Sequence, residues 1–187
     1  MVSEEQLSER RFGWSNMFVP EEDDPRVDGG WNNDERSVLL GFLSDRRLTL
    51  EMKCEDLDAQ QMARRSVPPS DMSLLGLVRH LTSVEQHWCE RVIAGLEIDR
   101  LYRDPDGVDL AFAVQPDQEL IEAAWAAWDS QVDRSNRVIL GVADLANLGR
   151  GEPVPVREVL VHLIREYSQH LGHADLLRER LDGRVGQ

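Results

Sequence analysis

The sequence lacks the features that mark several large functional classes. It contains no run of about 18 consecutive apolar residues, so no membrane-spanning helix is predicted. Basic residues are scarce, because 21 Lys and Arg stand against 35 Asp and Glu, which gives a net charge of −14. Nucleic acids and anionic membranes both attract basic surfaces, so neither is an expected partner. There is no glycine-rich phosphate loop and no internal repeat.

Cysteine is also scarce. The two cysteines, Cys54 and Cys89, form neither a Cys-x-x-Cys motif nor a disulfide framework. The N-terminal residues MVSEEQLSERR contain no apolar segment of the kind found in signal peptides. We therefore expect a cytoplasmic protein in which both thiols are reduced.

The sequence does contain four long amphipathic segments, and it has almost no strand pattern. The segments are expected from Asn33 or Asp34 to about residue 57, from Ser70 or Ser73 to about residue 94, from about residue 118 to Gly141, and from Val156 to about residue 181. This pattern predicts an all-α protein, a four-helix bundle formed by residues 33–184. The polar connection over residues 96–117 is long enough to cross between distant ends of such a bundle.

Residues 1–32 form an acidic extension that contains Trp14, Phe18 and Trp31. These large aromatic side chains predict an extension packed on the bundle rather than a free tail. The same segment is also compatible with a lid that lines a pocket.

The last segment, from Val156 to Leu181, is the most informative. At about 100° per residue, and with Glu166 as the origin, His170 lies near +40°, His173 near −20° and His162 near −40°. The four polar residues share this face with the apolar Val159, Leu163 and Leu177. A buried acid is costly unless it is paired or binds a metal, so this face is a candidate site. The alternative is a set of hydrogen-bonded core residues.

A metal site needs a ligand from a second helix. Glu166 and His170 are four residues apart and are therefore neighbours on one helix face. On the segment that ends near residue 94, His80 lies at the edge of the apolar stripe and His87 lies about 20° from it. Periodicity alone does not choose between these two histidines. Cys89 falls on about the opposite face from His80 and is a poor candidate ligand.

Two stretches resemble a known family. SLLGLVRHLTSVEQHWCERVIAG (73–95) and VLVHLIREYSQHLGHADLLRERLDGR (159–184) resemble the DinB/YfiT-like superfamily of metal-binding four-helix bundles. Within it, they are similar to the actinobacterial branch associated with mycothiol-dependent S-transfer. The resemblance implies a crossed helix order, made possible by the long connection, and a bound divalent metal, most commonly zinc or nickel. The implied metal ligands are His80, Glu166 and His170.

The resemblance also places other residues around that metal. Many relatives carry histidine where this chain has Glu166. In having glutamate at this position, the chain is similar to the mycothiol-dependent maleylpyruvate isomerases. His162 and His173 are then expected beside the ligands or the substrate. Three protein ligands leave one coordination position open, as in catalytic zinc sites, and two histidines with one carboxylate also suit non-haem iron.

The function implied is a metal-dependent thiol S-transferase. A metal favours the thiolate form of a coordinating thiol, and because neither cysteine is well placed, the thiol should come from a cosubstrate such as mycothiol. The acceptor would be a small electrophile, and Arg46, Arg47 or Arg79 could orient its carboxylate. The alternatives are a mycothiol-dependent isomerase, a non-catalytic metal-binding or stress-associated bundle, and a metal-free bundle. Apolar helix faces allow a homodimer.

Overall fold

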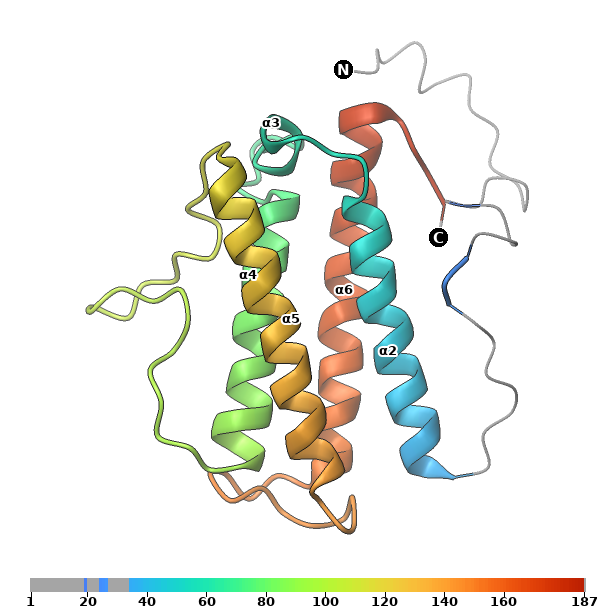
Figure 1. The fold of residues 1–187 in the computed structure, drawn as a ribbon, viewed down its shortest axis with the longest axis vertical. Coiled ribbons are helices and arrows are strands. Elements are labelled where there is room, and N and C mark those ends of the chain that lie inside the picture. Colours follow the sequence, from blue (N-terminus) through green and yellow to red (C-terminus); the bar gives the residue numbers. More distant parts are fainter. Residues whose placement is uncertain (1–18, 20–23, 27–33, 187) are drawn as a thin grey trace.

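The computed structural model describes residue 19, residues 24–26 and residues 34–186 of the chain. Within these ranges all regular elements are helices, and the predicted all-α bundle is confirmed (Figure 1). They are α2 (Glu35–Cys54), α3 (Ala59–Met62), α4 (Leu74–Glu85), the π-helix η2 (Gln86–Ile93), α5 (Gln118–Leu140) and α6 (Val156–Asp182).

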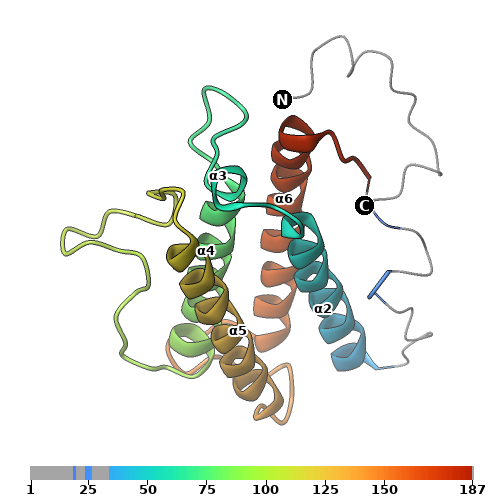
Figure 2. The same cartoon turned by 45° about the horizontal axis from the view of Figure 1, so that its top comes forward.

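The four long helices do not alternate in direction. In Figure 1, α2 and α6 run upward, whereas α4 and α5 run downward. Helix α2 packs on α6, and α4 packs on both α5 and α6. Because α4 and α5 are parallel, the chain must return over the length of the bundle between them, and residues 96–117 make this crossover (Figures 1 and 2). The connection over residues 96–117 therefore makes the crossover that its length predicted.

The helix ends follow from local side-chain chemistry. The side chains of Asp34, Ser73 and Asp117 accept hydrogen bonds from backbone N–H groups in the first turns of α2, α4 and α5. Gly183 ends α6 in the left-handed conformation, with φ of 81°. Helix α2 ends at Cys54, three residues before the predicted end. The following connection, expected to be a loop, contains the short helix α3, which has a capping box at its start.

Helix α4 changes its hydrogen-bonding pattern after Glu85. The next eight residues form the π-helix η2, which the sequence pattern did not predict. Gly95, shortly after the end of η2, has a φ of 71°, in the left-handed region that favours glycine, close to the predicted helix end near residue 94. π-Helical segments are rare in proteins, but those that do occur are frequently found at functional sites. The segment here carries His87 and Trp88.

A buried polar network joins all four long helices. Arg47 on α2 donates two hydrogen bonds of 2.7 Å to the carboxylate of Glu85 on α4. Tyr167 on α6 donates a 2.9 Å bond to the same carboxylate, and Trp128 on α5 donates a 2.9 Å bond to the Tyr167 hydroxyl. The side chains of Glu85 and Tyr167 are fully buried. The network thus ties α6, through Tyr167, to α4 and α5 next to the position of Glu166.

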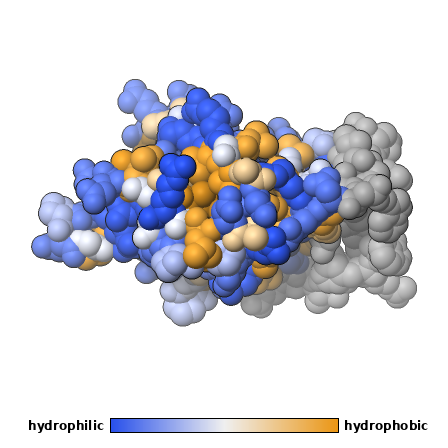
Figure 3. Space-filling model, turned by 90° about the horizontal axis from the view of Figure 1, so that it is seen from below, coloured by the Kyte–Doolittle hydropathy of each residue, from blue (hydrophilic) through white to orange (hydrophobic). Residues whose placement is uncertain are grey.

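The predicted extension of residues 1–32 lies mostly outside the described residues, including Trp14, Phe18 and Trp31. In its described part, Arg26 pairs with Asp24 and donates a 3.2 Å hydrogen bond to Thr49 on α2. Seen from the lower end of Figure 1, surface hydrophobic residues gather near the middle of that face, with hydrophilic residues among and around them (Figure 3). Among the described residues, no helix is both long and apolar enough to span a membrane.

Candidate metal centre

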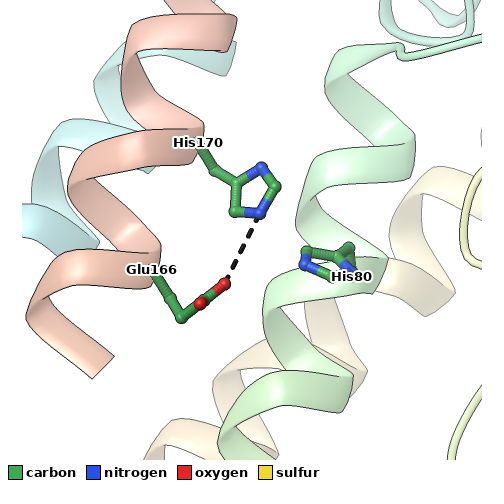
Figure 4. Close-up of side chains that lie close together, drawn as sticks. All are labelled: His80, Glu166 and His170. Carbon is green, nitrogen blue, oxygen red and sulfur yellow. Dashed lines mark ion pairs between the residues drawn. The ribbon is translucent and has the colours of Figure 1, made fainter. Parts of the chain in front are cut away.

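Three polar side chains from two helices converge between α4 and α6. His80 projects from α4 towards Glu166 and His170, which lie one turn apart on α6 (Figure 4). Each offers one ligand atom, and these atoms lie within 4.8 Å of one another. The rings of His80 and His170 are 4.5 Å apart, centre to centre. This is the combination that the family resemblance implied, and it is the one such group found among the described residues.

The two histidines of this cluster are neutral near pH 7. Burial is the main cause that lowers the pKa of His80. Burial, together with the adjacent His80, lowers the pKa of His170 to about 4. The 3.6 Å contact between His170 Nε2 and Glu166 Oε2 is therefore a polar contact rather than an ion pair. Two neutral imidazoles and a carboxylate present lone pairs to the same small volume.

His162 has a defined tautomer and contacts Glu166. Arg165 lies 2.8 Å from His162 Nδ1, and a guanidinium can only donate, so Nδ1 accepts this hydrogen bond. The ring proton is then on Nε2, which lies 3.4 Å from Glu166 Oε1. Trp88 from η2 covers the other side of the ring, at 4.2 Å between centres. Glu166 is thus held from one side while its second oxygen faces His170.

His173 lies behind His170. Their Nδ1 atoms are 3.4 Å apart, so one ring can donate its proton to the other. Both His162 and His173 therefore contact the cluster, as expected for residues that orient ligands. Both are half-buried at the edge of the bundle. The sequence pattern had placed them on the core face.

The crossover connection covers His80. Phe112 stacks on the His80 ring at 5.7 Å, and a side chain at Gly76 would place its Cβ 2.4 Å from the Phe112 ring. Arg79 donates to the carbonyl of Ala113 and lies over the ring of Tyr102 at 4.4 Å. The sequence pattern gave no indication of Phe112. A glycine in the first turn of a helix, one turn before a candidate ligand, was the available signal, because a glycine inside a helical pattern often has a packing reason.

The remaining candidates do not belong to this cluster. His87, which periodicity left as an alternative to His80, packs edge-on against Trp88 at 5.1 Å and is not among the converging ligand atoms. Arg47 is engaged by Glu85, and Arg79 by the crossover. Cys54 and Cys89 are buried, and burial raises the pKa of each thiol to about 12.

A family model described as mycothiol-S-transferase matches residues 38–183, which is most of the chain and all of the bundle except its outermost residues. The chain belongs to the mycothiol-S-transferase family. The resemblance to the DinB-like branch is thereby confirmed. Searches among curated proteins and among solved structures found no match.

The residues of this mycothiol-S-transferase family member fit a metal ion. His80 Nε2 is buried and has no hydrogen-bond partner within the described part of the chain. A buried nitrogen without a partner costs folding free energy unless a hydrogen bond or a bound ion compensates for it. His80 belongs to the same cluster in which Glu166 and His170 present ligand atoms. Histidine nitrogen and carboxylate oxygen are ligands that zinc and other first-row divalent metals accept.

Proposed function

We propose that this protein is a metal-dependent transferase that joins the sulfur of mycothiol to a small electrophile. The observation that carries the proposal is the convergence of His80, Glu166 and His170, with an unpartnered buried nitrogen on His80, in a chain of the mycothiol-S-transferase family. The three side chains would hold one divalent cation. When bound, zinc or nickel would favour the thiolate form of a coordinating thiol, which is the nucleophilic form.

The nucleophile comes from outside the chain. A thiol with a pKa of about 12 is almost entirely protonated at neutral pH, and both cysteines are buried as well. In the transfer, the thiol proton of the cosubstrate passes to solvent water, or ends on the oxygen of an opened epoxide, and the sulfur forms a bond with the electrophilic carbon. The bond from that carbon to the leaving group, or to the oxygen of an epoxide, breaks with its electron pair.

The surrounding residues orient the three ligands. His162 Nε2 lies 3.4 Å from Glu166 Oε1, and Glu166 Oε2 lies 3.6 Å from His170 Nε2. His173 accepts the Nδ1 proton of His170 when the Nε2 lone pair of His170 is in use. Phe112 covers one face of His80 and restricts water there. Outer groups of this kind set ligand direction and basicity.

The proposal is tested by measuring conjugation of mycothiol to an activated aryl halide. Protein stripped with a chelator should be inactive, and one equivalent of zinc or nickel should restore activity. His170→Ala should stay inactive after the same treatment, whereas Arg137→Gln, which changes an exposed arginine on α5, should behave as wild type. Full activity in stripped protein or in His170→Ala would refute metal dependence.

A further inference from the structure

One cavity in the described part of the chain lies away from the His80 cluster. It has a volume of about 690 Å³ and lies at the end of η2, between residues 95–100 and residues 150–152. Its lining includes His87, which does not belong to the His80 cluster. Volumes of this order are typical of small-molecule sites.

One wall of the cavity is fixed to the end of η2 by backbone contacts. Arg150 N donates to the carbonyl of Ile93, and Gly151 N donates to the carbonyl of Val92, each at 3.0 Å. The approach is so close that a Cβ at residue 151 would lie 1.9 Å from the carbonyl oxygen of Arg91. Only glycine allows this contact, so the wall is built into the fold.

The opposite wall is also fixed. The side chain of Gln86 accepts from Leu101 N at 2.9 Å and donates to the carbonyl of Asp99 at 3.2 Å. Arg91 donates to the carbonyl of Ile98. Both walls are therefore attached to η2 before any ligand arrives, and preorganisation of this kind lowers the entropic cost of binding.

The charged side chains that line the cavity are not paired with each other. Arg100 and Arg150 make no ion pair with any described residue, and neither do the carboxylates of Glu97, Asp99 and Glu152. The lining thus combines guanidinium donors with carboxylate acceptors. In addition, His87 Nδ1 is buried without a hydrogen-bond partner among the described residues.

This mixture indicates the chemistry of the occupant. A simple anion would meet as many carboxylates as arginines, and it would be repelled by half of the charged lining. A hydroxyl group both donates and accepts, so a hydroxyl-rich ligand satisfies carboxylates and guanidinium groups together. The arrangement therefore favours a neutral polyhydroxylated unit, such as a sugar or cyclitol.

A half-buried strip connects the cavity with the His80 cluster. Along α4 and η2, the side chains of His80, Ser83, Val84, His87 and Arg91 are all partly exposed, whereas the residues between them are mostly buried. His80 and His87 are seven residues apart, which corresponds to about 10 Å along a helix. One elongated ligand can therefore reach both places.

We propose that the cavity around His87 holds the hydroxyl-rich part of the thiol cosubstrate while its sulfur lies at His80, Glu166 and His170. This inference rests on the proposed function. Arg100 and Arg150 donate to hydroxyl oxygens, the carboxylates accept from hydroxyl groups, and His87 Nδ1 gains the partner that it lacks.

Calorimetric titration of metal-loaded protein tests the inference. Mycothiol should bind at least about ten-fold more tightly than N-acetylcysteine, which has a thiol but no hydroxyl-rich unit. In the double variant Arg100→Gln/Arg150→Gln, mycothiol should lose at least about ten-fold in affinity while N-acetylcysteine binds as before. Arg137→Gln, which removes one exposed positive charge from α5, should change neither affinity. Thermal melting of each variant confirms that it is folded.

A second arm separates this inference from the proposed function. S-methylated mycothiol has no thiol to lose its proton, but it keeps the hydroxyl groups, so it should still bind wild type and bind the double variant more weakly. If it does so while the protein shows no thiol-dependent activity, the cavity assignment stands and the transferase assignment fails. Equal binding of S-methylated mycothiol to wild type and the double variant would overturn the cavity assignment. Displacement of mycothiol by inorganic phosphate would also overturn it, because it would identify an anion site.

Discussion

The buried pair of Arg47 and Glu85 offers a quantitative test of how the bundle holds its site. The side chain of Arg47 is 8% exposed and that of Glu85 is 0% exposed, and two hydrogen bonds of 2.7 Å join them. Glu85→Leu leaves the Arg47 charge buried without its carboxylate, and Arg47→Met leaves the Glu85 charge without its guanidinium. Each single change should lower the free energy of unfolding by about 3–5 kcal/mol, the usual cost of leaving one buried charge unpaired.

The double variant Arg47→Met/Glu85→Leu should be much less destabilised than the sum of the two single variants. It removes both charges and fills the space with apolar atoms, and such replacements are often neutral. Tyr167 still loses its acceptor, which adds a cost of about 1–3 kcal/mol. The expected interaction energy in the double-mutant cycle is therefore several kcal/mol in favour of the double variant.

Urea unfolding followed by circular dichroism provides the measurement. The slope of the free energy with denaturant should stay constant across the four proteins, so that the differences report stability alone. Additive effects, with the double variant losing about 6–10 kcal/mol, would refute the description of this pair as a coupled buried unit.

Three further predictions concern other parts of the molecule. Burial raises the pKa of both thiols from 9.0 to about 12, so the thiols of the unfolded state lose their protons at lower pH than those of the folded state. The free energy of unfolding should therefore fall as the pH rises through 9, by about 1.4 kcal/mol per thiol between pH 8 and pH 10. In Cys54→Ala/Cys89→Ala this pH dependence of the unfolding free energy should disappear, and an unchanged pH dependence would contradict the prediction. The new methyl group of Gly172→Ala meets no atom within 4 Å, so this variant should raise the melting temperature. Gly76→Ala displaces Phe112 and should instead weaken metal binding. Equal melting temperatures and equal metal affinities of the two variants would contradict the packing of Phe112 on α4. His162→Phe removes the imidazole nitrogen that contacts Glu166 and should weaken zinc affinity by about ten-fold in competition with a chelator. Wild-type affinity would remove His162 from the set that orients the ligands.

Much of the fold was predictable from the sequence because the helices are marked at their ends. Asp34, Ser73 and Asp117 are capping residues before apolar stripes, and Gly183 ends the last helix. The 96–117 connection was also long enough to predict a crossover between distant ends of the bundle, which the parallel arrangement of α4 and α5 requires. The π-helix was not predictable, because it differs from an α-helix in which carbonyl each N–H reaches, and the spacing of apolar residues over only eight positions does not reveal that difference.

The cluster was predictable in part. The spacing of Glu166 and His170 follows from helix geometry, but the choice of His80 over His87 required the family resemblance, since both lie on the same side of one helix. The structure brings His80 to α6 and directs His87 to a different cavity. The contact of Phe112 with His80 joins residues 32 positions apart, and no periodic pattern reports such a contact.

Metal stoichiometry tests the central claim most directly. Untagged protein, so that no tag histidines bind metal, is incubated with zinc or nickel, passed over a desalting column and measured by elemental analysis. Wild type and His87→Ala should each retain about one equivalent, whereas His80→Ala and His170→Ala should retain essentially none, because two ligands do not replace three. A full equivalent in both His80→Ala and His170→Ala, or an empty wild-type protein after exposure to each metal, would contradict the assignment of His80, Glu166 and His170 as the metal site.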